Sequence, residues 1–164
     1  MWKCPKCGVM LLTRNLWHSC GRATLDDWKA RMGPTARAFY DRFEQMIAAC
    51  GEYSVGPAKT RIAFLGEVRF ANIIKLNEKE MICTFALPKP VRSRRVMKVE
   101  EVVPNWWVHY LRITDLRQLD DQVQAWIRDS YRLMGMRERL RSAAQSSRQI
   151  HPGAHLSRNA NGVE

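Results

Sequence analysis

Residues 68–87 read VRFANIIKLNEKEMICTFAL, two apolar segments separated by a short polar stretch. Residues 68–76 and 81–87 are rich in β-branched, aromatic and other apolar residues, and the stretch Asn-Glu-Lys at 77–79 has the composition of a hairpin connection. This pattern predicts two antiparallel strands joined by a tight turn. Three further short apolar runs lie at residues 61–65, 96–103 and 106–113. Together these segments predict a mainly antiparallel sheet of about five strands.

Helical periodicity flanks the predicted strands on both sides. Apolar residues recur at three- and four-residue intervals over residues 34–49, and a shorter helix is expected over 25–32. The longest helix is expected to begin at Thr114 or Asp115. The predicted fold class is therefore α+β, an antiparallel sheet packed by helices. Its predicted core contains Phe39, Phe43, Ile62, Phe64, Phe70, Ile82, Phe85, Leu119, Val123, Trp126 and Ile127.

Composition restricts the class of protein and of partner. The chain has 164 residues, of which 46% are hydrophobic and 26% charged, which excludes a wholly disordered or collagen-like protein. The 27 Lys and Arg residues outnumber the 16 Asp and Glu residues, and the net charge of +11 favours a polyanionic partner. No apolar run reaches the about 18 residues of a membrane span, and the N-terminus lacks an apolar signal region. We therefore expect a cytoplasmic protein without a membrane partner.

Changes in composition divide the chain into three parts. Residues 1–22 hold a Cys/His cluster with little apolar periodicity, and residues 23–141 form the predicted α+β domain. Residues 142–164 are dominated by Ser, Gln, Asn, Gly and Arg, with almost no apolar content. Such a composition cannot bury enough apolar surface to fold, so this basic tail is expected to be disordered.

The N-terminal cluster has the spacing of a metal site. Cys4 and Cys7 are separated by two residues, His18 and Cys20 by one, and a glycine follows each pair. Two cysteines at this spacing can wrap a tight turn around one ion, and residues i and i+2 of an extended segment project from the same face. Three thiolates and one imidazole form a closed tetrahedral set, which predicts structural zinc. The alternative is that these are free thiols in a short tail.

The same N-terminal residues resemble a known group of sequences. The combination Cys-Pro-Lys-Cys-Gly and His-Ser-Cys-Gly is similar to the start of an uncharacterised, mostly bacterial family in which a short Cys/His element precedes a small α+β domain. Residues 59–64 and 68–71 are similar to its first two strands, and residues 119–131 to its last helix. The resemblance spans roughly residues 1–134. It implies a compact antiparallel sheet packed by helices, as in small secretion-chaperone-like domains, and no established activity.

The basic loop, residues 89–98, is the leading candidate for contact with a partner. It contains five cationic residues and no acid: Lys89, Arg92, Arg94, Arg95 and Lys98. Basic side chains neutralise phosphates, and the nearby Trp106 and Trp107 could stack on unpaired bases, which indicates a nucleic-acid surface. The alternative is a solvated charged loop with the tryptophans packed in the sheet.

A second candidate site combines residues of two predicted strands. If their register brings Lys59, Arg61, Trp107 and His109 together, they form a polar pocket able to hold a small anion. The alternative places His109 in a hydrogen bond within the sheet. No nucleophile, acid–base pair or phosphate-binding motif is present, so an enzyme is the least favoured class. The sequence favours a non-enzymatic binding module with structural zinc that contacts nucleic acid, with a protein-interaction or ligand-binding domain as the alternative.

Overall fold

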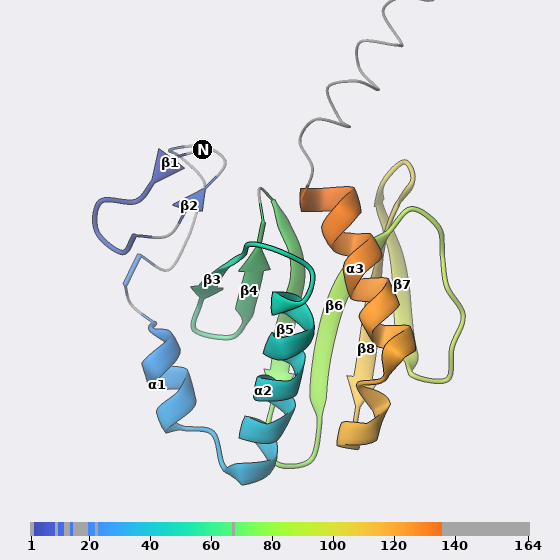
Figure 1. Ribbon diagram of the computed structural model, residues 1–164, viewed down its shortest axis with the longest axis horizontal. Helices are drawn as coiled ribbons and strands as arrows, with labels where there is room; N and C mark the ends of the chain where they lie inside the picture. The colour runs from blue at the N-terminus through green and yellow to red at the C-terminus, as the bar shows by residue number, and fades with distance from the viewer. Residues whose placement is uncertain are drawn as a thin grey trace, which may run out of the picture.

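The computed structural model describes residues 2–8, 10–11, 14, 20–21, 23–66 and 68–135. A two-stranded ribbon of β1 (Trp2–Lys3) and β2 (Met10–Leu11) precedes an α+β body (Figure 1). The predicted basic tail, residues 142–164, lies outside the described residues, as does the end of the predicted main domain after residue 135. Among the described helices, none has the length and apolar character needed to cross a membrane.

The body is built on one antiparallel sheet, which the structure describes with six strands. Their order across the sheet is β3-β4-β5-β6-β8-β7, and every neighbouring pair is antiparallel. The strands are β3 (Ser54–Pro57), β4 (Ile62–Leu65), β5 (Arg69–Leu76), β6 (Met81–Leu87), β7 (Val96–Val103) and β8 (Trp106–Ile113). The predicted hairpin of residues 68–87 is the β5–β6 pair, with Leu76 opposite Met81.

The prediction of five strands is wrong by one, because β3 was missed. Its sequence, Ser54-Val55-Gly56-Pro57, contains two residues that normally interrupt strands. The strand nevertheless forms at the edge of the sheet, where it pairs only with β4 and sets Val55 opposite Phe64. An edge position tolerates proline because one side of the strand needs no hydrogen-bonding partner.

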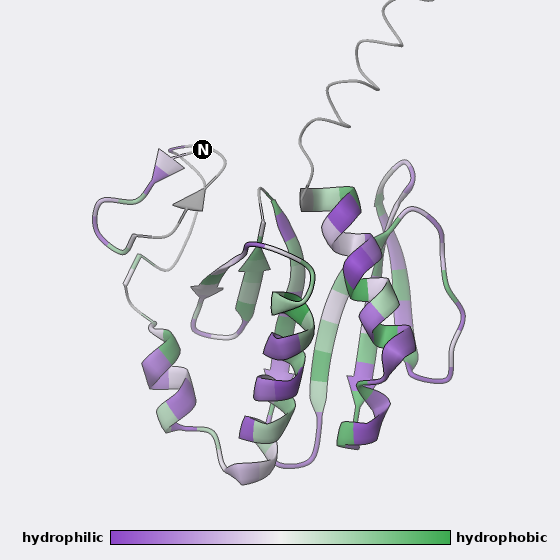
Figure 2. Ribbon diagram, viewed as in Figure 1, coloured by the Kyte–Doolittle hydropathy of each residue, from purple (hydrophilic) through white to green (hydrophobic). Residues whose placement is uncertain are grey.

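Helices cover one face of the sheet. α2 (Pro34–Ala48) and α3 (Asp121–Gly135) lie side by side in front of the central strands, and α1 (Leu25–Ala30) lies beyond α2 near β3 (Figure 1). α2 begins at its proline, as expected from the sequence, and α1 begins with a capping box. Figure 2 shows hydrophobic strands beneath the helices and many hydrophilic residues on the outward sides of α2 and α3.

The core lies between this face of the sheet and the two long helices. All of the predicted core residues except Ile82 are buried. Side chains alternate along β6, so Cys83 and Phe85 point into the core and Ile82 points to the opposite face, where it pairs with Arg112 of β8. The prediction that Ile82 belongs to the core is therefore wrong, because its side chain lies on the other face of the sheet.

The start of the last helix also differs from the prediction. The chain after β8 forms a short 3-10 turn, Leu116–Gln118, whose N-cap is Asp115. α3 begins six residues after that cap, and the Asp120 carboxylate accepts a hydrogen bond from the backbone N–H of Val123 at 3.1 Å. Two cap residues in succession therefore divide a segment that the apolar periodicity alone joins into one helix starting at Thr114 or Asp115.

Candidate metal centre and basic loop

Three cysteine side chains converge next to the N-terminal ribbon. The Sγ atoms of Cys4 and Cys20 lie 3.7 Å apart, and those of Cys4, Cys7 and Cys20 all lie within 4.8 Å of one another. Zinc–sulfur bonds of about 2.3 Å in tetrahedral geometry place sulfur atoms about 3.8 Å apart. Cys4 is buried and the other two are half-buried. The donor chemistry and the spacing therefore fit one thiolate-bound metal ion.

Backbone geometry explains how the thiols come together. The N–H of Gly8 donates to the carbonyl of Cys4 at 2.9 Å, which closes the turn that carries Cys4 and Cys7. Gly8 has a φ of 73° and Gly21 a φ of 80°, in the left-handed region that glycine adopts without a Cβ clash. These φ values explain why a glycine follows each pair of candidate ligands, since glycine lets the chain reverse its direction around the cluster.

The described cysteines lie in two kinds of environment. The hydrogen bond with Cys4, followed by burial and the charges of Cys4 and Cys7, raises the pKa of Cys20. Burial alone raises the pKa of Cys83 in β6 to about 12, and neither Cys83 nor Cys50 belongs to a metal-type group in the part of the chain that the structure describes. The three clustered thiols are thus distinct from the thiols of Cys50 and Cys83, which belong to or pack against the core. His18, the fourth predicted ligand, lies outside the described residues.

The basic loop between β6 and β7 is anchored to the body at two points. The N–H of Val91 donates to Nε2 of His109 at 2.8 Å. The Arg95 guanidinium donates to the Gln118 carbonyl at 2.6 Å and to the Asp120 carboxylate at 3.0 Å, and it lies 5.6 Å from the centre of the Trp126 ring. Only 16% of the Arg95 side chain is exposed. The loop therefore has a fixed position relative to β8 and α3.

The five predicted contact residues consequently differ in what they can reach. The Arg95 side chain is bound to the 3-10 turn and the start of α3, and Lys98 pairs with Glu100, which raises the pKa of Lys98. Three are exposed and form no ion pair with any described residue: Lys89, Arg92 and Arg94. The anchored loop therefore presents three uncompensated cations to solvent.

The structure does not bring the predicted anion-pocket residues together. Lys59 and Arg61 lie in the connection between β3 and β4, whereas Trp107 and His109 lie on β8. β5 and β6 separate these strands, and three strand spacings amount to about 14 Å.

His109 itself has a structural environment. It is fully buried and stacks on Phe85 with ring centres 5.7 Å apart. Because Nε2 accepts from Val91, Nδ1 carries the proton and donates to the Trp107 carbonyl at 2.8 Å. Burial lowers the pKa of His109, so the ring is held neutral between two backbone groups.

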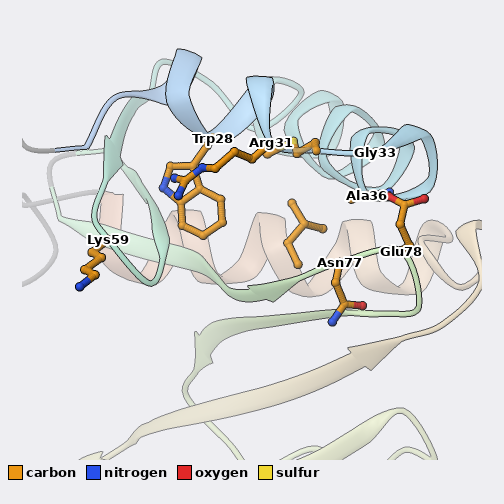
Figure 3. Close-up of a pocket in the computed structure, with 9 residues that line it drawn as sticks. Trp28, Arg31, Gly33, Ala36, Lys59, Asn77 and Glu78 are labelled. Atoms are coloured by element: carbon orange, nitrogen blue, oxygen red, sulfur yellow. The ribbon is translucent and has the colours of Figure 1, made fainter.

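A cavity of about 300 Å³ lies between α1, the start of α2 and the β5–β6 turn (Figure 3). Its lining includes Trp28, Arg31, Met32, Lys59, Leu76 and Glu78. Of these residues, only Lys59 is a candidate site residue on sequence grounds, and there it is grouped with Arg61, Trp107 and His109. The cavity is assembled from three segments that are remote in sequence, and none of them carries a recognisable ligand motif. Only the packing of α1 against the edge of the sheet brings them together.

Comparison with known proteins places the body of the chain in a family. No curated protein matches the chain, and no solved structure matches it. A family model described as a domain of unknown function, DUF5655, matches residues 26–134. The match confirms the expected resemblance to an uncharacterised domain family, and it begins after the N-terminal cysteine cluster. It covers α2, nearly all of α1 and α3, and the six strands of the main sheet that the structure describes, and the chain therefore belongs to the DUF5655 family.

Proposed function

We propose that the protein is a non-enzymatic binding module that contacts nucleic acid through its basic loop and is stabilised at its N-terminus by structural zinc. The zinc ligands in this proposal are Cys4, Cys7, His18 and Cys20. The phosphate-contacting residues are Lys89, Arg92 and Arg94.

The geometry of the thiols supports the zinc part of the proposal. Three sulfur atoms within 4.8 Å of one another leave one position of a tetrahedral site, and His18 is two residues before Cys20 in the sequence. A set of three thiolates and one imidazole leaves no position for substrate water, which favours a structural role over a catalytic one. Bound zinc would hold the short β1–β2 ribbon against residues 20–21.

One observation carries the nucleic-acid part: the anchored loop presents Lys89, Arg92 and Arg94 without acidic partners among the described residues. A loop fixed by Val91 and Arg95 loses little conformational entropy when it meets a polyanion. The net charge of +11 adds long-range attraction for phosphates. Such contacts position a nucleic acid without reading its sequence.

The test is a salt-titrated binding assay with single- and double-stranded DNA and RNA of equal length. We expect affinity to fall steeply with salt, and replacement of Lys89, Arg92 and Arg94 by Gln to flatten the slope by up to about 3 units, roughly one for each phosphate contact. A matched control removes three exposed charges elsewhere: Lys79→Gln, Arg128→Gln and Arg132→Gln. If the two triple variants weaken binding equally, the attraction comes from net charge and the loop is not the contact surface. If the wild type binds no nucleic acid at low salt, the proposal is wrong.

A further inference from the structure

The cavity between α1, α2 and the β5–β6 turn has an apolar interior with a fixed aromatic wall. Trp28 reaches from α1 into the gap above the sheet (Figure 3), and its indole N–H donates to the Ala58 carbonyl at 2.9 Å. This bond fixes the plane of the ring. Half-buried Met32 and Leu76 and buried Ala36 supply the other apolar walls. A planar apolar group fits such a site because it can stack on a ring that is already ordered.

Two positively charged side chains lie at one end of this cavity. The Arg31 guanidinium lies 5.6 Å from the centre of the Trp28 ring, and its Nε donates to the Asp27 carbonyl at 2.9 Å. Its terminal nitrogens form no hydrogen bond or close ion pair with a described residue, although the charge of Arg31 contributes to lowering the pKa of Asp27. Lys59 lies at the same end and forms no ion pair with a described residue, but its ammonium group points away from the cavity (Figure 3).

The carboxylate at the opposite end is already hydrogen-bonded within the protein. The Glu78 carboxylate accepts hydrogen bonds from the backbone N–H groups of Thr35 at 3.1 Å and Ala36 at 3.0 Å, at the start of α2. These bonds lower the pKa of Glu78, and the positive end of the α2 dipole compensates its charge. Glu78 therefore offers little attraction to a cationic ligand, and the free charge of the cavity is positive.

We propose that this cavity binds a small planar organic anion, with its ring against Trp28, Met32 and Leu76 and its carboxylate toward Arg31. The volume of about 300 Å³ is at the lower end of the range for small-molecule sites. The site is separate from the basic loop and does not depend on nucleic-acid binding. Its two cations are also distinct from the residues assigned to phosphate contact.

The test uses naphthoate as the probe and isothermal titration calorimetry of the full chain. We expect saturable binding at one site with a dissociation constant of about 1 mM or below, the range for ligands of this size. Naphthalenemethanol, the uncharged counterpart, should bind about tenfold more weakly. Arg31→Gln, which keeps most of the side-chain stem but removes the charge, should reduce naphthoate affinity about tenfold and leave naphthalenemethanol affinity unchanged.

Matched variants separate this site from general charge attraction. Arg128→Gln removes a charge that is also exposed, on α3, and should leave naphthoate binding unchanged, as should the triple variant of Lys89, Arg92 and Arg94. Trp28→Phe keeps an aromatic wall but loses the bond to Ala58, and it should weaken both probes. Absence of saturable naphthoate binding, or equal losses in Arg31→Gln and Arg128→Gln, would overturn the proposal. Neither result bears on the basic loop.

Discussion

The backbone N–H of Val91 donates a hydrogen bond to Nε2 of His109 at 2.8 Å, across the gap between the basic loop and the sheet. The imidazole can accept this bond only while Nε2 is unprotonated. A fully buried histidine therefore holds the loop that presents Arg92 and Arg94. The position of the exposed cations depends on the protonation state of a core residue.

This bond predicts a loss of stability in mild acid. Burial lowers the pKa of folded His109 below its ordinary 6.5, so between these two values the unfolded chain binds a proton that the folded chain does not. The stabilisation is complete above about pH 6.5 and decreases as the pH falls below it. We expect the difference in free energy of unfolding between wild type and His109→Gln, measured in urea, to shrink from pH 8 to pH 5. A difference that is constant over this range would show that His109 does not titrate in this way.

The strands of the main sheet illustrate what the sequence can predict. The apolar runs bounded by Asn77–Lys79 and by Pro88 correspond to β5 and β6. They could be predicted because most of their apolar residues are buried in the sheet, as the local sequence pattern indicates. β3 was missed because its four residues include Gly56 and Pro57, which normally interrupt strands, and its position depends on long-range pairing with β4. Ile82 was assigned to the core because an apolar residue in a strand does not itself reveal which face it occupies.

The candidate sites show the same limit. The cysteine spacing predicted a cluster because its members are close in sequence, and the structure brings Cys4, Cys7 and Cys20 together. Neither the burial of Arg95 against Trp126 nor the separation of Arg61 from His109 could be inferred, since both depend on strand order and on the position of α3. Long-range contacts of this kind have no local sequence pattern.

Ser130 provides a test of packing between α3 and the sheet. Its hydroxyl donates to the Phe70 carbonyl at 2.7 Å and accepts from the Ala86 N–H at 3.0 Å, so it bridges β5 and β6 from a fully buried position. Ser130→Ala leaves both backbone groups without this partner, and we expect a loss of about 1–3 kcal/mol in the free energy of unfolding. The exposed neighbour Asp129→Ala should change stability by less than about 0.5 kcal/mol. Equal effects of the two variants would contradict the bridging role.

Trp126 tests the packing of α3 on the core. The side chain is 8% exposed and stacks on Phe85 with ring centres 5.8 Å apart, while Arg95 lies over it. Trp126→Ala removes this contact area and leaves a cavity, so we expect a loss of about 3–5 kcal/mol by chemical denaturation. A loss below about 1 kcal/mol would mean that this face of α3 does not pack as the structure shows.

The thiol cluster predicts one zinc ion for each chain. Elemental analysis of protein purified without chelator should give this ratio, and Cys7→Ser should lower it because one of three close sulfur donors is lost. The α+β body should stay folded in this variant, since its core contains no residue of the cluster. Cys50→Ser, which lies outside the cluster, is the matched control and should retain the metal. Protein without zinc, or equal loss of zinc from both variants, would contradict the assignment.

Arg92 and Arg95 have the same side chain and lie three residues apart in the basic loop, yet the structure predicts opposite consequences of replacing them. Arg95 donates to Gln118, Asp120 and Gln122 and is 16% exposed, whereas Arg92 is exposed without an ion pair to any described residue. Arg95→Ala should therefore cost about 1–2 kcal/mol in the free energy of unfolding, the lower part of the range for charged hydrogen bonds because Asp120 is partly solvated. Arg92→Ala should leave stability unchanged within about 0.5 kcal/mol.

Replacing Arg92 and replacing Arg95 should also have different effects on the salt dependence of nucleic-acid binding. Arg92→Ala should reduce the slope by about 1 unit, since one phosphate contact and its released counterion are lost. Arg95→Ala should weaken binding through movement of the loop, and Arg95→Lys, which keeps the charge but cannot reproduce the forked contacts, should weaken it as well. If Arg95→Lys binds nucleic acid as tightly as the wild type and Arg95→Ala does not, Arg95 contacts phosphate directly. In that case its bonds to the start of α3 do not persist in solution.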